Sequence, residues 1–370
     1  MPIRISLVAL VTLVLGACSD QEVETRPPLL VTADWLNRSL TVFAQEPLLA
    51  GSAPVEDAIL GTVDLSAWPP GPVEVEITPD GETAIVAVGP GFFQSGITNI
   101  LIGSPDVPNG SAVLLVDLES LEVTAEISTR HAPLGIAITP DGARAYTANY
   151  GLSGASGDSV SVIDIAAGRL IEEFSVGGRP EQIAIDPDGR IAIVNLAGSQ
   201  GGVQLFSLSD PTGTLSDLLP TGNDPSDVTF LQDSTRAIVA NSFSTDFTLL
   251  DTSNPAAPVV VQNVLAEGGA PYGVTYLPGR DQILAPTGVP AALIVLSRGE
   301  NIVIPSAPLG LPGGPFPLVG VPDSNESHVF VPHMSAQSDA QMSIVDLDDG
   351  GVRSVRWLET SGPAYIATWP

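Results

Sequence analysis

The chain has 370 residues and is strongly acidic, with 42 aspartate and glutamate residues against 13 basic residues and a formal net charge of −29. All of the basic residues are arginine, so there is no lysine to form a Schiff base. Nucleic-acid binding depends on basic surface, so the charge excludes a general function of that kind and we expect no nucleic acid partner. Abundant glycine (37) and proline (34) with only 15% charged residues favour many short strands over long helices.

The N-terminal 28 residues predict export and anchoring. Residues 5–17 form an apolar run of roughly 13 residues after the positive charge of Arg4, and a permanent transmembrane helix would need ~20. The run closes with Leu15-Gly16-Ala17-Cys18, which resembles the lipobox of bacterial lipoproteins. The resemblance implies a signal peptide at residues 1–17, lipidation of Cys18 and a tether over residues 18–28. Serine follows Cys18, which by the same resemblance implies the outer membrane, facing the periplasm or the cell surface, with the lipid as the only membrane contact.

An internal repeat fills the chain from residue 29 to the C-terminus. Each copy begins with a leading proline, which is followed seven residues later by a second turn-forming residue, with alternating apolar residues between them. Three copies end this run with Pro-Asp-Gly. The leading prolines are Pro72, Pro133, Pro180, Pro225, Pro271, Pro315 and Pro363. After a first interval of 61 residues they recur every 44 to 48 residues, which predicts a radial or solenoid array of similar units.

Each unit has the pattern of four antiparallel strands. In the second full copy, residues 134–139, 144–149, 159–165 and 170–176 alternate apolar and polar side chains between turn residues. Two runs of this copy, Ala145-Tyr146-Thr147-Ala148-Asn149 and Ser159-Val160-Ser161-Val162-Ile163-Asp164, resemble the YVTN repeat of β-propellers. The resemblance covers residues 29–370 and implies an all-β fold, a seven-bladed β-propeller of four-stranded antiparallel blades.

The two ends of the chain predict how the ring closes. Residues 29–34, 39–44 and 59–65 have the pattern of second, third and fourth strands without a first, while residues 364–369 supply one strand at the C-terminus. We therefore expect that C-terminal strand to pair with the three N-terminal strands, which leaves no open sheet edge. The alternative, an open solenoid, would need capping segments, and the sequence shows none.

The propeller resemblance also implies where a ligand would bind. In such blades the connections between blades and the loops between second and third strands share one face, at the mouth of the central channel. Polar residues predicted at this mouth form the candidate ligand site: Arg130, His131, Asn149, Tyr150, Arg179, Glu181, Asp224, Asn241 and His333. The alternative for each asparagine is that its side chain satisfies loop backbone. An insertion at residues 89–111 is predicted either to form a lid or docking ridge on this face or to pack over the side of its own blade.

Motifs for catalysis or cofactor binding are not recognisable in this sequence. Cys18 is the only cysteine, Gly-x-Ser-x-Gly does not occur, and His131 and His333 lack a third ligand at metal-binding spacing, so we predict no metal and no cofactor and assign no catalytic residue. We expect a monomeric, non-catalytic binding or scaffold propeller of the cell envelope, with an envelope protein or a small molecule as its partner. The resemblance leaves two alternatives open: a lactonase-type hydrolase, with arginine, histidine and glutamate at the channel mouth, and an accessory subunit of a redox or metal system.

Overall fold

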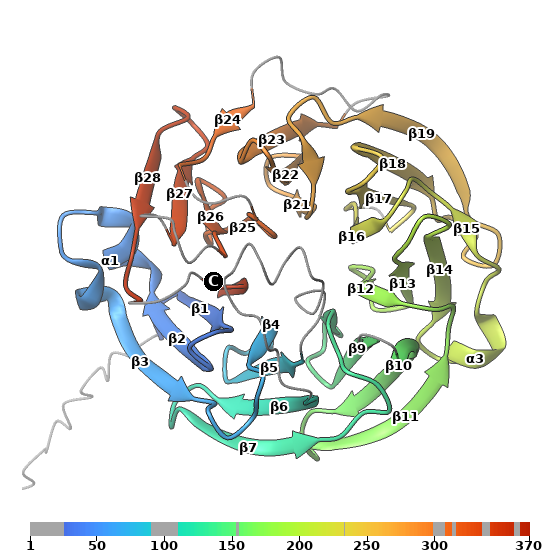
Figure 1. Ribbon diagram of the computed structural model, residues 1–370, viewed down its shortest axis with the longest axis horizontal. Helices are drawn as coiled ribbons and strands as arrows, with labels where there is room; N and C mark the ends of the chain where they lie inside the picture. Colours follow the sequence, from blue (N-terminus) through green and yellow to red (C-terminus); the bar gives the residue numbers. More distant parts are fainter. Residues whose placement is uncertain are drawn as a thin grey trace, which may run out of the picture.

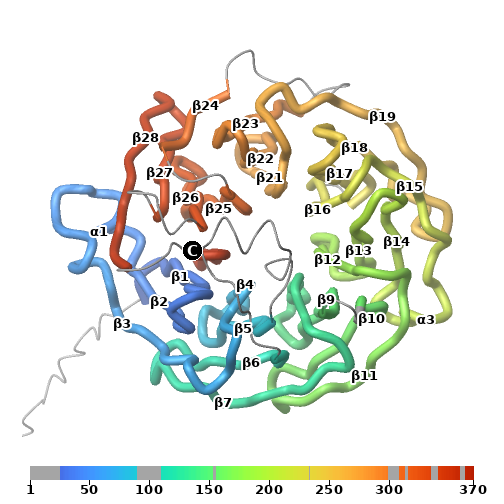
Figure 2. Tube along the Cα trace, in the orientation of Figure 1, coloured from blue at the N-terminus to red at the C-terminus, as the bar shows by residue number. Residues whose placement is uncertain are grey.

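The computed structural model of the protein describes residues 26–89, 110–152, 155–232, 234–298, 308–312, 316–334, 341–358 and 363–370. Seven antiparallel sheets stand around a central axis (Figure 1), which confirms the predicted all-β, seven-bladed propeller. Figure 2 shows that the chain passes around the ring in sequence order, from the blue N-terminal strands to the red C-terminal ones. The predicted signal peptide, Cys18 and residues 90–109 of the insertion lie outside the described residues.

The blades are built alike, each running from an inner strand at the channel to an outer strand at the rim of the disc. The first blade contains β29 (Tyr365–Trp369), β1 (Leu29–Asp34), β2 (Ser39–Ala44) and β3 (Ile59–Asp64). The second contains β4 (Pro72–Ile77), β5 (Thr83–Val88), β6 (Ala112–Asp117) and β7 (Glu122–Ile127). The third contains β8 (Ile136–Ile138), β9 (Arg144–Leu152), β10 (Ala155–Asp164) and β11 (Arg169–Ser175). The fourth contains β12 (Pro180–Ile185), β13 (Ile191–Leu196), β14 (Gly202–Ser207) and β15 (Leu219–Pro220).

The remaining three blades follow the same order. The fifth contains β16 (Pro225–Phe230), β17 (Arg236–Asn241), β18 (Asp246–Asp251) and β19 (Val259–Leu265). In the sixth, the inner strand is divided into β20 (Ala270–Pro271) and β21 (Thr275–Leu277), followed by β22 (Gln282–Gly288), β23 (Ala292–Ser297) and β24 (Leu309–Gly310). The seventh contains β25 (Val321–Pro322), β26 (His328–Pro332), β27 (Met342–Asp346) and β28 (Val352–Val355). Among the described residues, helical turns are short: α1 (Gln45–Ala50), η1 (Val55–Ala58) and α3 (Pro211–Thr214).

The repeated Pro-Asp-Gly motif makes a tight turn between the first and second strands of a blade. In the second blade, the Thr78 hydroxyl donates a hydrogen bond of 2.6 Å to Asp80 Oδ1, which also accepts the backbone N–H of Glu82 at 3.0 Å. Gly81 has φ +75°, a left-handed conformation that glycine adopts without a Cβ clash. The third blade repeats the same contacts, so the motif recurs because each of these hairpins needs the same turn.

The hydrophobic core lies between neighbouring blades. Both faces of a blade pack against adjacent sheets, so a middle strand such as β5 is buried at five of its six positions. One cluster joins Val31 and Val42 of the first blade to Val75 and Val86 of the second. The alternating apolar pattern read from the sequence therefore supplies two packed faces rather than one.

Pairing of the two chain ends closes the ring. β29 is antiparallel to β1, with Leu29 opposite Trp369 and Ala33 opposite Tyr365, so the predicted composite blade is confirmed and the open solenoid is wrong. The same C-terminal strand contacts both neighbouring blades. Trp369 Nε1 donates to the Pro79 carbonyl at 2.9 Å in the second blade, and the Thr368 hydroxyl donates to the Pro322 carbonyl at 2.9 Å in the seventh.

Candidate functional site

One face of the disc carries both the connections between blades and the loops that follow second strands. Backbone hydrogen bonds join these two kinds of segment: Ala197 N–H donates to the Arg179 carbonyl at 2.9 Å, and Ser242 N–H donates to the Asp224 carbonyl at 3.0 Å. We call it the channel-mouth face. The Pro-Asp-Gly turns lie at the opposite ends of the strands, so the face assignment predicted from the repeat is the one observed.

A cavity of about 430 Å³ opens on the channel-mouth face, and we call it the mouth cavity. Its lining residues come from strands and connections of all seven blades: Val73, Glu74, Leu134, Tyr150, Arg179, Glu181, Gln182, Asp224, Ser226, Asp227, Ser242, Phe243, Tyr272, Val289, Phe316, Leu318 and Tyr365. Because separate blades hold these side chains, their relative positions are fixed by the ring and not by a single flexible loop.

The residues that directly follow the leading prolines form a ring around the mouth cavity in six of the seven blades. They are Val73, Leu134, Glu181, Ser226, Tyr272 and Phe316. Glu181 is the only charged member of this ring. A single carboxyl group therefore stands among apolar and aromatic side chains and one serine.

The Glu181 carboxyl group lacks the compensation that a partly buried charge normally has. No described residue donates a hydrogen bond to it. Burial raises its pKa well above the usual range of a glutamate, and the negative charges of Asp224 and Asp227 raise it further, whereas only Arg179 lowers it. A carboxyl group in this environment favours a cation or a hydrogen-bond donor placed beside it.

Arg179 is the single basic residue among the described residues of the lining, and it is engaged with an aromatic ring. Its guanidinium carbon lies 4.9 Å from the ring centroid of Tyr150, and the guanidinium donates a hydrogen bond to the Tyr150 hydroxyl. Burial raises the pKa of Tyr150 to about 12. Among the described residues, Arg179 forms no ion pair within 4.0 Å with a carboxylate of the cavity.

Arg179 and Asp224 also share an uncommon backbone conformation. Each stands directly before a leading proline and has a positive φ, +59° for Arg179 and +58° for Asp224. Non-glycine residues adopt this left-handed region infrequently, and it concentrates where the surrounding structure dictates the backbone. The Asp224 carboxylate is fixed by the Gly198 N–H at 2.8 Å and by the Ser242 hydroxyl at 3.3 Å.

Two further acids of the lining connect blades to one another. Glu74 accepts the Ile136 N–H at 2.7 Å and the Gln182 side-chain amide at 2.5 Å, while Asp227 Oδ2 accepts the Val274 N–H at 2.8 Å. Burial raises the pKa of Glu74 well above the glutamate range and that of Asp227 to about 7. These two acids stand two residues after their leading prolines, whereas Glu181 stands one residue after its own. Their carboxyl groups bond to the inner strands of other blades.

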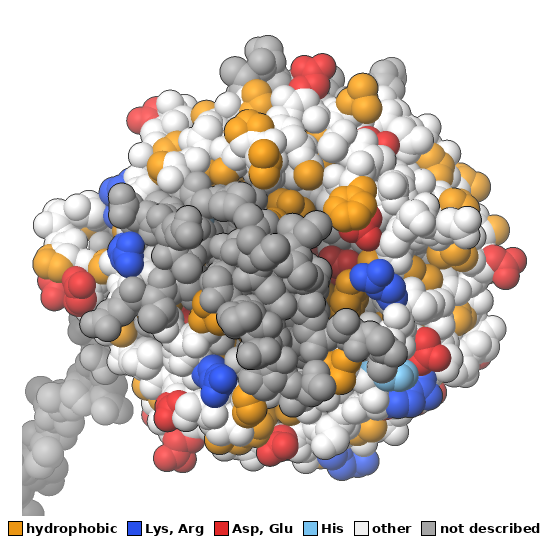
Figure 3. Space-filling model, viewed as in Figure 1, with side chains coloured by type: hydrophobic (Ala, Val, Ile, Leu, Met, Phe, Trp, Pro, Cys, Tyr) orange, Lys and Arg blue, Asp and Glu red, His pale blue; other side chains and the backbone are white. Residues whose placement is uncertain are grey.

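The space-filling view along the disc axis shows how charge is distributed on the described surface (Figure 3). To the right of the centre, acidic, hydrophobic and basic side chains lie next to one another, and elsewhere on this face basic side chains are few and scattered. The lining of the mouth cavity likewise combines acidic residues with apolar ones.

Four of the nine predicted ligand-site residues line the mouth cavity: Tyr150, Arg179, Glu181 and Asp224. Arg130 and His131 do not line it. Arg130 pairs with Asp158 at 3.0 Å and lies 3.6 Å from Glu173, and His131 Nδ1 is 3.6 Å from the same Asp158. Both side chains therefore lie against Asp158 of the third blade and outside the lining of the mouth cavity.

The other three predicted residues, Asn149, Asn241 and His333, are buried inside their blades. Asn149 Nδ2 donates to the hydroxyls of Ser159 and Ser161 at 3.0 and 2.8 Å. Asn241 Nδ2 donates to Asp246 and Thr248, and His333 Nε2 lies 2.7 Å from the Ser343 hydroxyl. Burial lowers the pKa of His333 to about 4. All three lie in or directly after the second strand of a blade and bond to side chains of the third. The two asparagines therefore neither line the cavity nor satisfy loop backbone, which was the alternative.

Sequence reasoning missed several residues of the lining, notably Glu74, Asp227, Tyr272, Phe316 and Tyr365. The signal that finds them is the repeat itself. All five stand one or two residues after a leading proline, so aligning the copies on their prolines would have brought these residues together.

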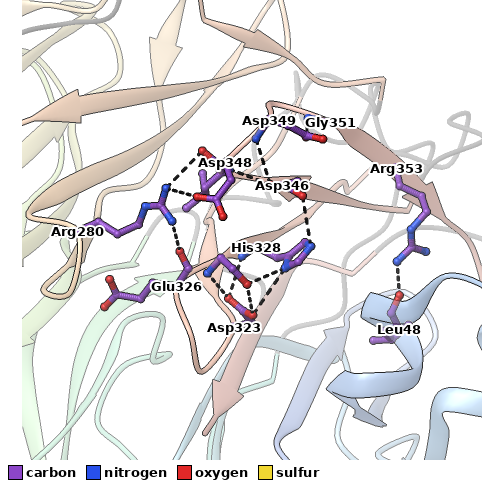
Figure 4. A network of polar contacts seen from close by, with 12 residues as sticks. Leu48, Arg280, Asp323, Glu326, His328, Asp346, Asp348, Asp349, Gly351 and Arg353 are labelled. Atoms are coloured by element: carbon purple, nitrogen blue, oxygen red, sulfur yellow. Dashed lines mark hydrogen bonds and ion pairs between the residues drawn. The ribbon is translucent and has the colours of Figure 1, made fainter.

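A second polar cluster occupies the opposite face, between the sixth and seventh blades (Figure 4). His328 Nδ1 lies 2.9 Å from the Ser327 hydroxyl, and Asp323 Oδ1 accepts the His328 backbone N–H at 2.8 Å. Arg280 donates to Asp348 at 2.7 Å and to the Glu326 carbonyl at 3.0 Å. These contacts join turns of adjacent blades, so this cluster stabilises the ring at the face opposite the cavity.

Two features of the described residues bear on the kind of site. In this part of the chain no group of three or more histidine, cysteine, aspartate or glutamate side chains is arranged to hold a metal ion. Nor does any helix of the described segments have the length and apolar character needed to cross a membrane.

Comparisons with known proteins establish the fold alone. No protein-family model matches the chain, and no curated protein matches it. The structure is similar to hydrazine synthase of Kuenenia stuttgartiensis, with 22% identity, a TM-score of 0.58 and coverage of 75% of this chain and 77% of that one. It is also similar to a functionally unknown protein from Desulfotomaculum acetoxidans, with 18% identity, a TM-score of 0.70 and coverage of 92% and 98%. At these identities the likeness supports a β-propeller and carries no chemistry.

Proposed function

We propose that this chain is a lipid-anchored binding propeller of the cell envelope that holds a small ligand in the mouth cavity without converting it. The observation that carries the proposal is Glu181, a carboxyl group with no hydrogen-bond donor among the described residues, placed in a cavity that all seven blades line. Burying a carboxyl group without a hydrogen-bond partner costs stability, and a bound partner would supply the missing interaction. Export, lipidation at Cys18 and an outer-membrane location are part of the same proposal and rest on the N-terminal residues.

The composition of the lining favours binding over hydrolysis. A lactonase-type site would combine arginine, histidine and glutamate around one substrate, with a base to activate water. The described lining supplies Arg179 and Glu181, whereas His131 lies against Asp158 and His333 lies inside the seventh blade. The accessory function in a redox system has the likeness to hydrazine synthase as its only support, and a likeness at 22% identity does not extend to function.

The anchoring part of the proposal is tested at the lipobox-like cysteine. In the native host, Cys18→Ala removes the thiol that would be acylated, so lipid labelling should be lost and the protein should leave the membrane fraction. Labelling with a radioactive or clickable fatty acid, followed by membrane fractionation, measures both effects. Ser19→Ala is the matched control and should keep the label. Unchanged labelling of the Cys18 variant would refute lipidation at this residue.

The binding part is tested with a panel of small cations, anions and neutral compounds by ligand-observed NMR. We expect at least one compound to bind the wild-type protein and to be recovered unchanged by mass spectrometry. Its affinity should fall about tenfold or more in Phe243→Ala and should change in Arg179→Ala, downward for an anion and upward for a cation, since both residues are exposed at the cavity rim and their replacement should spare the fold. Arg190→Ala, an exposed arginine of a Pro-Asp-Gly turn, is the control on the opposite face. If the affinity is the same in wild type and in both rim variants, the cavity is not the binding site.

A further inference from the structure

We propose that the ligand of the mouth cavity is an organic ammonium ion that carries a ring or another apolar body. The inference rests on the proposed binding function and adds the chemical class of the ligand. It follows from three features of the lining: its excess of acidic groups, the engagement of its only basic group, and its aromatic walls.

The carboxyl groups of the lining outnumber its basic groups, since Glu74, Glu181, Asp224 and Asp227 are opposed by Arg179 alone. Three of these four carboxyl groups already accept hydrogen bonds from the protein. Glu181 accepts none from a described residue, and Asp224 is close enough to raise its pKa. An ammonium group placed between Glu181 and Asp224 would give Glu181 a charged donor and would reduce the repulsion between the two acids.

The engagement of Arg179 argues against an anionic ligand. Its guanidinium group stacks on Tyr150 and bonds to the Tyr150 hydroxyl, so an anion could recruit it only by giving up these contacts. Such an anion would also meet the carboxyl groups of Glu181 and Asp224 at close range. The field of the whole molecule has the same sign, with a formal net charge of −29, and attracts cations to the cavity.

Aromatic and aliphatic walls provide the surface for an apolar body. Tyr272 and Phe316 lie with ring centroids 5.8 Å apart at an interplanar angle of 46°, and both line the cavity. Ring faces attract cations as well as packing against hydrocarbon, so the same walls suit both parts of an organic ammonium ion. At the rim, Phe243 and Val289 are 74% and 75% exposed, which leaves apolar surface that a ligand in the cavity would cover.

Binding of an ammonium ion should release a proton from the cavity. Without ligand, burial and the charges of Asp224 and Asp227 raise the pKa of Glu181, with Arg179 opposing them. The neighbouring hydroxyl of Tyr150 stays protonated, because burial raises its pKa to about 12. A bound cation favours the carboxylate, so the proton leaves and affinity increases as pH rises, up to the pKa of the amine near 10.

Three near-isosteric probes test the charge requirement on the full-length protein: 2-phenylethylammonium, the neutral 2-phenylethanol and the anion phenylacetate. Isothermal titration at pH 7.5 in two buffers with different ionisation enthalpies gives both affinity and proton release. We expect the ammonium probe to bind at least about tenfold more tightly than the alcohol and the anion to bind more weakly than either. Glu181→Gln should weaken the ammonium probe about tenfold or more, leave the alcohol within about threefold and reduce proton release. Asp217→Asn removes one exposed negative charge outside the cavity and should leave all three affinities unchanged.

The outcomes separate this inference from the proposed function. If phenylacetate or 2-phenylethanol binds most tightly and depends on the rim residues Phe243 and Arg179, the cavity binds ligands but the ammonium assignment is wrong. Equal ammonium affinity in wild type and Glu181→Gln would likewise overturn the assignment. If replacement of Glu181, Phe243 or Arg179 changes the affinity of none of the three probes, the inference and the binding function of the cavity both fail.

Discussion

Removal of residues 364–370 should abolish cooperative unfolding of the entire ring, not merely fray its C-terminus. The deletion takes away β29 and so the inner strand of the first blade, along with the fully buried side chains of Ala364 and Ile366. It exposes the edge of β1 and breaks the contacts of Trp369 and Thr368 with the second and seventh blades. Truncating one buried isoleucine to alanine costs about 2–5 kcal/mol, so loss of the strand should exceed that and approach the total stability of a domain.

Urea unfolding followed by far-UV circular dichroism and tryptophan fluorescence measures this effect. The matched control deletes only Pro370, which is exposed and lies beyond β29, and it should unfold like the full chain. A synthetic peptide of residues 363–370, added to the truncated protein, should restore part of the lost stability by pairing with β1. A truncated chain with the midpoint of the full-length protein would contradict closure by this strand.

Acidification from pH 8 to pH 5 should stabilise the protein, opposite to the behaviour of proteins whose native acids are held ionised. Burial raises the pKa of Asp34 and of Asp227 from 3.8 to about 7, and that of Glu76 from 4.5 to about 8. The folded state therefore binds more protons than the unfolded chain between about pH 4 and pH 8. Stability from these groups is fully present below their unfolded pKa values and is lost as pH rises through the folded ones. Since one pKa unit is worth about 1.4 kcal/mol, we expect a loss of at least about 2 kcal/mol between pH 5 and pH 8.

Asp34 permits a clean test of this pH dependence. Its carboxyl group is fully buried and accepts hydrogen bonds from the hydroxyls of Thr32 at 2.9 Å and Thr41 at 2.6 Å. Asp34→Asn removes the titrating group and should flatten the slope of unfolding free energy against pH, measured by urea titration at constant ionic strength. Glu119→Gln removes an exposed charge and should keep the wild-type slope, which separates burial from net charge. A wild-type stability that rises from pH 5 to pH 8 would show that these acids are ionised in the native state.

Strand positions were predictable because alternation and turn residues are local properties of the chain. The predicted N-terminal strands at residues 29–34, 39–44 and 59–65 correspond to β1, β2 and β3, with a difference of one residue at the end of β3. Predictions were looser at inner strands. Residues 134–139 were expected in the third blade, whereas β8 spans Ile136–Ile138, because Leu134 and Gly135 belong to the lead-in that approaches the channel mouth. Helix α1 was not predicted, since its six residues, including Pro47, carry no helical periodicity.

The candidate site was predictable only in part, and the division follows the geometry of the blades. Tyr150, Arg179, Glu181 and Asp224 were found because they neighbour leading prolines or second-strand ends, which repeat position alone brings to one face. Asn149 occupies an equally regular position but turns into its blade, where Ser159 and Ser161 on the facing strand bind it. Sequence shows that a polar residue stands in the second strand, but it does not show which way that residue turns.

The seven units, their strands and the pairing of the C-terminal strand with the N-terminal ones were predictable without coordinates, because they depend on period, alternation and turn chemistry along the chain. Which side chains meet across the channel became visible only in the folded ring. Glu181 and Gln182 are adjacent in sequence, but Glu181 faces the cavity and receives no hydrogen bond from a described residue, whereas Gln182 donates to Glu74, 108 residues away in the chain. Such distances depend on how the blades pack around the axis. Hydrophobic packing between blades sets that spacing, and no pattern within a single strand records it.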